Sequence, residues 1–191
     1  MEMRTRLIEA TLTCLEKWGY HGASLTRILE EAGVSRGAWR HHFSTKNDLV
    51  AAAAEYALNR AVATTRALDR DLPPEQQDLG RLFDFIWENY YTGRHRAVWL
   101  EFNVACRTEE TLRRRLTPVL EEFHAGIEKA WEEHFTTTPG TQIPAAAFLT
   151  LTINALRGMA VQSIVQDDQA YFKKLRSYWI SIVTPLIQRK E

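Results

Sequence analysis

The sequence predicts an all-α protein. Apolar residues recur at helical spacing along almost the whole chain, and no convincing run of alternating β-branched residues interrupts them. Hydrophobic residues make up 45% and charged residues 25% of the 191 residues, which is typical of a folded globular chain. Lysine plus arginine and aspartate plus glutamate both number 24, so any contact with nucleic acid has to come from a local basic patch.

Two helices are expected at the start of the chain. The first covers about residues 4–18, and Gly19 follows it in the place of a C-terminal glycine cap. Its apolar face is formed by positions with helical spacing, namely Leu7, Thr11, Cys14, Leu15 and Trp18. Ser24 is a good N-cap for a short second helix, and Gly33 ends that helix.

A third helix is expected over about residues 36–42, with Ser35 as its cap. A helix this short is not stable alone, so Val34, Trp39 and Phe43 have to hold it against the first two helices. Its opposite face is then free to contact a partner.

The rest of the chain predicts longer helices. Thr45 and Asp48 form a capping box at the start of a long fourth helix, and the two prolines of residues 69–78 predict a turn after it. Residues 145–165 are apolar around most of a helix, and residues 171–187 carry a broad apolar face. Three apolar stripes precede these two segments: Leu79, Leu82, Phe83, Ile86 and Tyr90; Val98, Phe102 and Ala105; and Leu112, Leu116, Val119, Phe123, Ile127 and Ala130.

The first helices have the geometry of a helix-turn-helix, in which the second helix of the pair enters the major groove of DNA. Residues 26–46 contain four basic side chains and two histidines, against two glutamates. Arg36 and Arg40 are four residues apart and share one helical face, while Trp39 falls on the other side. We therefore predict a DNA-binding domain over residues 1–47 and a larger helical domain over residues 48–191.

The first fifty residues strongly resemble the tetracycline-repressor (TetR) family. The resemblance rests on RLIEATLTCLEKWGYHGA and SLTRILEEAGVSRGAWRHHFSTKNDLV, which cover residues 6–50. The positions that match the spacing of the family are Gly19, Tyr20, Ile28, Ala32, Gly33, Val34, Ser35, Gly37, His42, Phe43 and Lys46. The resemblance implies about nine helices, a C-terminal domain that binds a small molecule, and a homodimer formed by the last two helices. It also implies a ligand-responsive repressor that binds a palindromic operator.

The resemblance also implies the DNA contacts. Carried over position by position, they fall on Thr26, Arg27, Ser35, Arg36, Gly37, Ala38, Arg40, His41, His42 and Lys46. Many members of the family have a tyrosine after a buried leucine where this chain has Arg40 after Trp39. The base preference of the family therefore does not transfer, because an arginine can bind phosphate or read guanine.

Candidate effector contacts come from the aromatic residues and from polar residues on apolar helices. They are Phe83, Trp87, Tyr90, Trp99, Phe102, Asn103, Phe123 and Asn154. Aromatic residues at helical spacing are more often plain core, so the alternative for each is a packing role. For Arg157 we favour the dimer interface or a structural pair over a ligand contact. This composition favours an apolar or flat aromatic effector.

Two alternatives stay open at this point. The first keeps DNA binding but makes the protein an activator, or a regulator without a small ligand. The second is a helical metal-dependent enzyme that uses Glu121 and His124, the Glu-x-x-His pair of di-iron bundles, although a second copy is missing. His41 and His42 diverge by about 100° on a helix and have no third ligand nearby.

Other sequence features favour a regulator over an enzyme. The chain has no Ser-His-Asp or Cys-His pattern, no glycine-rich phosphate loop and no HExxH, so we expect no enzyme activity, cofactor or metal. Cys14 and Cys106 have no metal or redox spacing and are expected to be free thiols. No apolar run approaches the ~20 residues needed to cross a bilayer, so we expect a cytoplasmic protein without a membrane partner.

Overall fold

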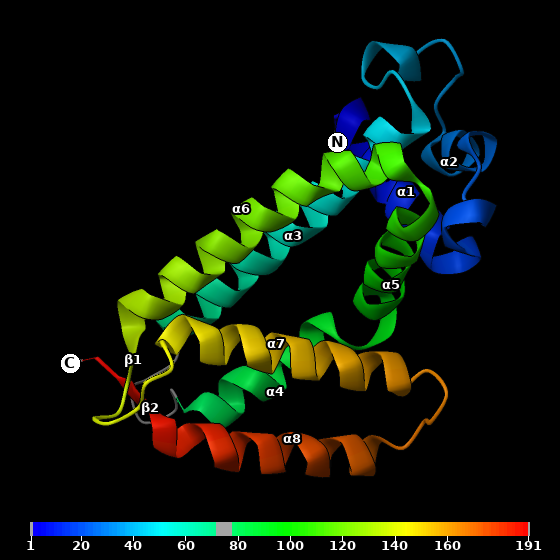
Figure 1. Cartoon of the computed structure of the whole chain (residues 1–191). Coiled ribbons are helices and arrows are strands. Elements are labelled where there is room, and N and C mark those ends of the chain that lie inside the picture. The colour runs from blue at the N-terminus through cyan, green and yellow to red at the C-terminus, as the bar shows by residue number, and fades with distance from the viewer. Residues whose placement is uncertain (1, 72–77, 191) are drawn as a thin grey trace. The chain divides into compact units, whose positions relative to one another are not determined.

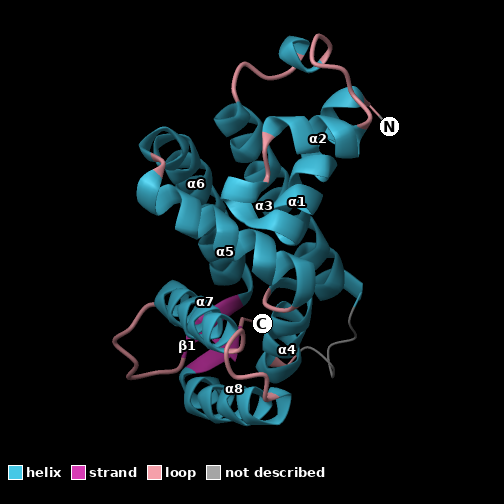
Figure 2. Ribbon diagram, turned by 90° about the vertical axis from the view of Figure 1, so that its right-hand side faces the viewer, coloured by secondary structure: helices cyan, strands magenta, loops and turns pink. Residues whose placement is uncertain are grey.

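The structure is a computed structural model that describes residues 2–71 and 78–190. Its described residues form eight α-helices, two short 3-10 helices and one small antiparallel ribbon, so the all-α prediction is confirmed (Figures 1 and 2). The elements are α1 (Met3–Gly22), α2 (Leu25–Ala32), η1 (Trp39–His41), α3 (Lys46–Asp71), α4 (Leu79–Tyr90), α5 (Gly93–Thr108), α6 (Glu110–His134), β1 (Phe135–Thr137), α7 (Ala145–Gln162), α8 (Gln169–Val183), η3 (Thr184–Leu186) and β2 (Ile187–Arg189). Most of the turn predicted over residues 69–78 lies outside the described residues.

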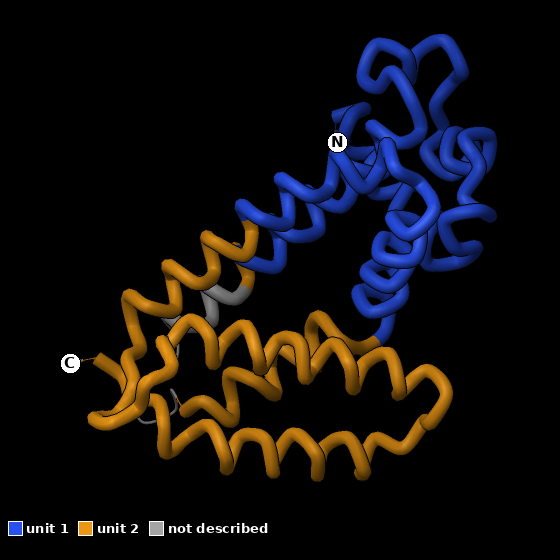
Figure 3. The backbone as a smooth tube through the Cα atoms, in the orientation of Figure 1, with its two compact units in different colours: residues 1–62, 93–122 blue, residues 63–92, 123–191 orange. Residues whose placement is uncertain are grey.

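The chain divides into two compact units, each built from two stretches of sequence (Figure 3). Unit 1 consists of Met1–Val62 and Gly93–Glu122, and unit 2 of Ala63–Thr92 and Phe123–Glu191. The long helices α3 and α6 therefore contribute residues to both units. The functional division expected at residue 47 stays a prediction.

Unit 1 has one continuous apolar core. Leu7, Leu15, Ile28 and Leu49 are fully buried in it and join α1, α2 and the start of α3. Trp39 is only 5% exposed and belongs to the same core, which confirms that its side chain packs inward. Residues of α5 and of the first half of α6 complete the cluster, so unit 1 includes more than the first three helices. Both cysteines are free thiols, as predicted.

The break predicted at Gly19, the cap predicted at Ser24 and the helix end predicted at Gly33 are confirmed. Regular helix geometry in α1 breaks at Gly19, whose φ of 66° lies in the left-handed region, and a further turn follows to Gly22. Ser24 caps α2, because its hydroxyl accepts a hydrogen bond from the backbone N–H of Arg27 at 3.3 Å. Gly33 ends α2 in the left-handed conformation, with φ 61°.

The third expected helix is less regular than predicted. Instead of an α-helix over residues 36–42, the chain forms a turn at residues 36–38 and the 3-10 helix η1. The N–H of His42 bonds the carbonyl of Trp39 three residues back, at 2.9 Å, whereas the N–H of Phe43 bonds the same carbonyl at 3.1 Å. Gly37 within so short a segment weakens the helix, because glycine has a high conformational entropy to lose.

The capping box at the start of α3 is confirmed. The backbone N–H of Thr45 donates to Oδ2 of Asp48 at 2.9 Å, and the N–H of Asp48 donates to Oγ1 of Thr45 at 3.1 Å. This reciprocal pair fixes the first turn of α3 directly after the irregular segment.

Unit 2 contains two apolar clusters rich in aromatic residues. In the first, Phe83 stacks on Trp131 with ring centroids 6.1 Å apart, and Phe148 and Val183 pack beside them. The second is built on Trp87, Tyr91, Leu156, Ala160 and Phe172. Residues from α4, α7 and α8 supply most of both clusters.

The ribbon in unit 2 was not expected from the sequence. Strand β1 pairs antiparallel with β2, and Phe135 lies opposite Arg189, whose guanidinium group sits 5.5 Å from the Phe135 ring centroid. Each strand has only three residues, and the two strands are about fifty residues apart in the chain. Segments this short carry no readable alternation, so only their pairing identifies them.

Within residues 2–71 and 78–190, no helix combines the length and the apolar character that crossing a membrane requires.

Candidate nucleic-acid interface

The predicted DNA contacts lie on α2, on the segment that follows it and at the start of α3 (Figure 1). The structure exposes most of them to solvent: Thr26, Arg27, Ser35, Arg36, Gly37, Arg40, His41 and His42. Ala38 and Lys46 are half-buried. The predicted set therefore forms a mainly exposed and basic surface, which suits contact with a phosphate backbone.

Arg36 links the irregular segment to α2. Its Nη2 donates to Oγ1 of Thr26 at 3.0 Å, so two predicted DNA contacts hold each other in place. Both side chains also line a groove of about 390 Å³ beside the glycine turn. The remaining lining residues are Leu29, Glu30, Gly33, Val34 and Ser35.

Arg6 supports the glycine turn from α1, a role that the sequence did not reveal. Its Nη2 donates to the carbonyl of Ala32 at 2.6 Å and to that of Gly33 at 3.1 Å. These carbonyls lie at the C-terminus of α2, where a positive charge is favourable. Because the two residues are 26 positions apart in the sequence, no local motif predicts the contact.

Lys46 is held at the first turn of α3 by Tyr20. The ammonium group donates to the carbonyl of Tyr20 at 2.7 Å and lies 4.1 Å from the centroid of its ring. The hydroxyl of Tyr20 donates to Oδ1 of Asn47 at 2.7 Å. Burial lowers the pKa of Lys46, while the charge of Glu109 opposes that shift. Lys46 thus has a fixed position next to the exposed segment.

Glu101 of α5 binds the same place on α1. Its Oε2 accepts a hydrogen bond from the backbone N–H of Tyr20 at 2.7 Å. A Cβ on Gly19 would lie 2.9 Å from that oxygen, so the absence of a side chain at Gly19 permits the close approach. Helix α5 is therefore bonded to the segment that also positions Lys46.

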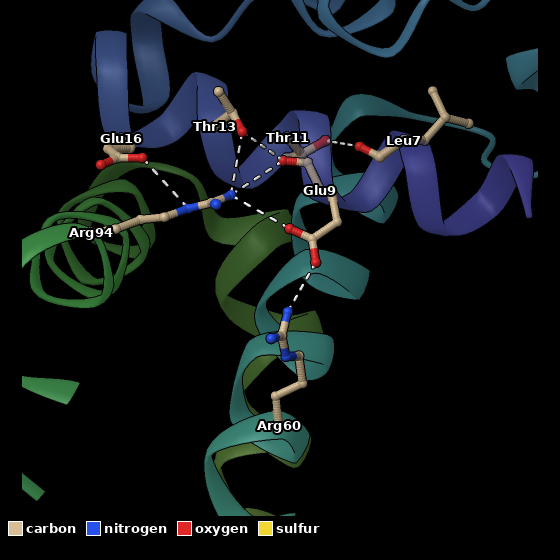
Figure 4. A network of polar contacts seen from close by, with 7 residues as sticks. All are labelled: Leu7, Glu9, Thr11, Thr13, Glu16, Arg60 and Arg94. Carbon is tan, nitrogen blue, oxygen red and sulfur yellow. Dashed lines mark hydrogen bonds and ion pairs between the residues drawn. The ribbon is translucent and has the colours of Figure 1, made fainter. Parts of the chain in front are cut away.

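A second polar network joins α5 to α1 within unit 1 (Figure 4). Nη2 of Arg94 lies 3.5 Å from Oε2 of Glu9, and Nε of Arg94 lies 3.5 Å from Oε2 of Glu16. Arg60 of α3 pairs with Oε1 of Glu9 at 3.0 Å, and Arg94 also donates to Oγ1 of Thr13 at 3.3 Å. Single exposed ion pairs contribute little, but this network connects three helices.

The predicted effector contacts fall into both units. Phe83 lies in the first aromatic cluster of unit 2, whereas Trp87 and Tyr90 lie in the second. The ring of Phe123 lies 5.7 Å from that of His124. Asn154 is exposed and donates to the carbonyl of Thr150 in its own helix, at 2.8 Å. The other three predicted contacts, Trp99, Phe102 and Asn103, belong to unit 1.

The three unit 1 residues differ in exposure. Phe102 is buried in the core and Trp99 is half-buried. Asn103 is exposed and donates to the carbonyl of Trp99, one helical turn earlier, at 2.7 Å. The side-chain amides of Asn103 and Asn154 thus each bond to their own helix.

Unit 2 also holds an ion pair between a buried arginine and a half-exposed aspartate, which sequence reasoning missed. Arg176 is 5% exposed, and its Nε donates to Oδ1 of Asp84 at 3.0 Å. The guanidinium group lies 4.5 Å from the ring centroid of Trp87, and that ring stacks on Phe172. The two residues are 92 positions apart in the sequence, and their contact connects α8 to α4.

A second polar cluster in unit 2 surrounds Arg157. Its Nη2 lies 3.4 Å from Nε2 of His124. Burial and the charge of Arg157 lower the pKa of His124, and Glu128 opposes the shift. Burial raises the pKa of Tyr91, whereas the charge and the hydrogen bond of Arg157 act in the other direction. This supports the expected structural pairing of Arg157.

Helices α7 and α8 expose apolar side chains. The large ones are Leu151, Val161, Tyr171, Tyr178 and Ile182, and Ile182 is 59% exposed. Gly158 is also exposed, and a Cβ built on it would meet no atom within 4 Å. An exposed apolar surface of this kind is typical of a protein interface.

Metal binding finds no support in the arrangement of donors. Among the residues that the structure describes, no three His, Cys, Asp or Glu side chains lie where they could hold a metal ion. The pair Glu121 and His124 therefore has no additional ligand in that part of the chain.

A capped helix pair with a basic exposed segment, in an all-helical chain, defines a helix-turn-helix DNA-binding protein. Residues 7–53 match the family model described as "Bacterial regulatory proteins, tetR family". The chain is 30% identical over 182 residues to the HTH-type transcriptional regulator CymR of Pseudomonas putida, covering 95% of this chain and 89% of that protein. The chain belongs to the tetR family and is a DNA-binding transcriptional regulator.

Solved structures agree with this assignment. A transcriptional regulator from Rhodococcus sp. Rha1 aligns with a TM-score of 0.73 at 22% identity, over 96% of this chain and 97% of that one. The multidrug binding protein EbrR complexed with imidazole aligns with a TM-score of 0.60 at 25% identity, over 94% and 95% of the two chains. The first likeness concerns the fold alone.

Proposed function

We propose that this regulator is a ligand-responsive repressor that binds a palindromic operator as a homodimer. The observation that carries the proposal is the exposed basic surface on α2 and the segment after it. In this proposal the DNA contacts are Thr26, Arg27, Ser35, Arg36, Gly37, Ala38, Arg40, His41, His42 and Lys46. Arg40 is exposed on η1 and is the side chain most suited to read a base. Its operator DNA would place the protein in the cytoplasm.

The exposed apolar face of α7 and α8 supports the homodimer. Leu151, Tyr178 and Ile182 would be covered by the same face of a second copy, as in a two-fold symmetric interface. The exposed Gly158 would let the two copies of α7 approach closely. Such a dimer would present the predicted DNA contacts of both copies to successive major grooves, with half-site centres at least ~34 Å apart.

The proposed effector is a small apolar or aromatic molecule. The aromatic clusters of unit 2 around Phe83, Trp87 and Tyr90 support this class. Phe123 and Asn154 of unit 2, and Trp99, Phe102 and Asn103 of unit 1, stay candidate effector contacts. EbrR, a multidrug binding protein, supports a small-molecule response. By linkage, an effector that weakens operator binding is itself bound more weakly by the operator complex.

The test of DNA recognition selects sites from randomised duplex DNA at ~0.15 M salt, where weak phosphate binding is suppressed. The native protein should recover one inverted repeat. Arg40→Ala should weaken binding to it by ~1 to 3 kcal/mol, because one base or phosphate contact is lost. Lys129→Ala, which removes an exposed charge from the unit 2 part of α6, is the matched control and should bind normally. Recovery of an asymmetric site, or of none, would contradict the proposal.

The dimer is tested separately by Ile182→Asp. A carboxylate at this exposed position would be buried and unpaired in a dimer, so the variant should sediment as a monomer at ~10 µM while keeping its helical content. Val104→Asp is the matched control, because Val104 is also an exposed apolar residue but lies on α5. Equal sedimentation of all three proteins would exclude this face as the interface.

A further inference from the structure

Trp18 is a large aromatic residue exposed beside the DNA-binding surface. It lies one residue before the break of α1 at Gly19, and it is 42% exposed although its position continues the apolar face of that helix. Two cations flank its ring: the guanidinium carbon of Arg27 at 5.3 Å and Nζ of Lys17 at 5.5 Å from the ring centroid. Both distances lie within the range of cation–π attraction.

Gly22 allows the main chain to pass close to the side chain of Trp18. A Cβ on Gly22 would lie 2.8 Å from Cβ of Trp18, a distance that real side chains do not show. The chain can therefore cross over Trp18 only because residue 22 is a glycine. The carbonyl of Gly22 then accepts a hydrogen bond from Nη1 of Arg27 at 2.7 Å. Arg27 is thus held by an aromatic ring and by a main-chain oxygen.

The two contacts leave Arg27 able to bind an anion. A guanidinium group has five N–H donors, and the Gly22 carbonyl uses one of them. The side chain is exposed and belongs to the first turn of α2, whose N-terminal N–H groups favour negative charge. An exposed arginine normally loses rotamer freedom when it binds phosphate, and a side chain that is already fixed loses less.

Lys17 differs from Arg27 in one respect. Its ammonium group lies 3.5 Å from Oε2 of Glu31 in α2, so its charge is already paired. Of the two cations beside the Trp18 ring, Lys17 is therefore paired with a carboxylate, whereas Arg27 is hydrogen-bonded to a main-chain carbonyl. This difference singles out Arg27 as the side chain that Trp18 prepares for an anionic partner.

We propose that Trp18 is a positioning residue for operator binding, which holds the guanidinium group of Arg27 in place for a DNA phosphate. This inference rests on the proposed role of Arg27 as a DNA contact. Trp18 itself need not touch the DNA. Replacing Trp18 should then change the operator affinity only while Arg27 is present.

A double-mutant cycle tests this directly. The dissociation constant for the selected operator is measured for the native protein, Trp18→Leu, Arg27→Ala and the double variant at several salt concentrations. Trp18→Leu should weaken binding about threefold to fivefold, which is the range of an exposed cation–π contact. In the Arg27→Ala background the same change should have no effect. Trp18→Phe keeps a ring face and should lie between the native protein and Trp18→Leu.

The salt dependence separates positioning from direct contact. Arg27→Ala should reduce the slope of log affinity against log salt by about one phosphate contact, whereas Trp18→Leu should leave the slope unchanged. Lys17→Ala is the control for the second cation and should change the affinity less than Trp18→Leu. Thermal unfolding should give similar midpoints for Trp18→Leu and Trp18→Phe, because the side chain is largely outside the core.

Three other outcomes would contradict the inference, and each has a different meaning. Equal weakening by Trp18→Leu in both backgrounds would mean that Trp18 acts on DNA or on folding without Arg27. An unchanged affinity in Arg27→Ala would remove the contact assigned to Arg27, and with it this role of Trp18. If the native protein selected no DNA site at all, the proposed repressor function itself would fail.

Discussion

The two compact units satisfy their polar groups in different ways. Around the predicted DNA contacts of unit 1, side chains mainly bond to main-chain atoms at helix ends: Lys46 and Glu101 to Tyr20, and Arg6 to Ala32. In unit 2, buried side chains bond to side chains of other helices. Examples are Arg176 with Asp84 at 3.0 Å, and Nε1 of Trp179 with Oγ1 of Thr152 at 2.9 Å.

This difference affects how each unit depends on its sequence. A main-chain carbonyl or N–H at a helix end is present whatever the sequence, so bonds to it fix the backbone next to the proposed DNA contacts. A bond between two side chains exists only while both residues are kept, so the interior of unit 2 depends more closely on which residues occupy it. Breaking one bond of each kind should therefore have different consequences.

The largest effect is expected for Asp84→Ala in unit 2. The variant leaves the guanidinium group of Arg176 buried and without its carboxylate, which should lower the free energy of unfolding by about 2–4 kcal/mol. Asp84 itself is 41% exposed, so the cost should stay below that of a fully buried pair. Denaturant unfolding measures the change. Glu88→Ala, at an exposed position of α4, is the control, and equal losses in the two variants would refute the interpretation.

A second variant tests whether the loss comes from the buried charge or from packing on Trp87. Arg176→Met keeps much of the side-chain volume against Trp87 and leaves only the half-exposed carboxylate of Asp84 behind. It should therefore cost less than Asp84→Ala, although it removes the same ion pair. The reverse order would mean that packing on Trp87, and not the buried charge, dominates at this site.

Unit 1 should respond to Gly19→Ala by a smaller loss, about 1–2 kcal/mol. An L-residue is strained at a φ of 66°, and the new methyl group would displace the carboxylate of Glu101 from the N–H of Tyr20. Because Tyr20 also holds Lys46, operator affinity should fall together with stability. Denaturant unfolding and operator titration measure the two effects.

Gly126→Ala is the matched control for that substitution. Gly126 lies inside α6, and a Cβ there would meet no atom within 4 Å, so alanine should stabilise the helix by about 0.5–1 kcal/mol. The two glycine variants should thus change stability in opposite directions. A destabilising Gly126→Ala would show that the contrast does not come from backbone conformation.

The sequence predicted the parts of unit 1 that depend on local signals. Ser24, Gly33 and the Thr45–Asp48 box act within three or four residues, and each ended or began a helix where expected. The irregular turn before Trp39 was harder, because no local signal shows whether packing can hold so short a segment containing Gly37 in a regular helix. Phe83 and Trp87 were recognised as apolar, but periodicity could not assign them to separate clusters.

The long-range partners could not be predicted in either unit. Arg6 meets Ala32 across 26 residues, Glu101 meets Tyr20 across 81, and Arg176 meets Asp84 across 92. A sequence pattern shows that such a side chain needs a partner, not which residue supplies it. The same limit applies to the candidate effector contacts, since Asn103 and Asn154 bond within their own helices.

The smallest effect expected is a pH dependence confined to unit 2. The folded pKa of His124 lies below the ordinary value of 6.5, first because of burial and then because of the charge of Arg157. The unfolded chain therefore binds this proton more readily than the folded chain does. Stability from this residue is complete above pH 6.5 and is lost as the pH falls from 6.5 through the folded pKa. Thermal midpoints at pH 7.5 and 5.5 should differ more for the native protein than for His124→Gln. An equal difference would show that other groups, and not the His124–Arg157 contact, govern acid sensitivity.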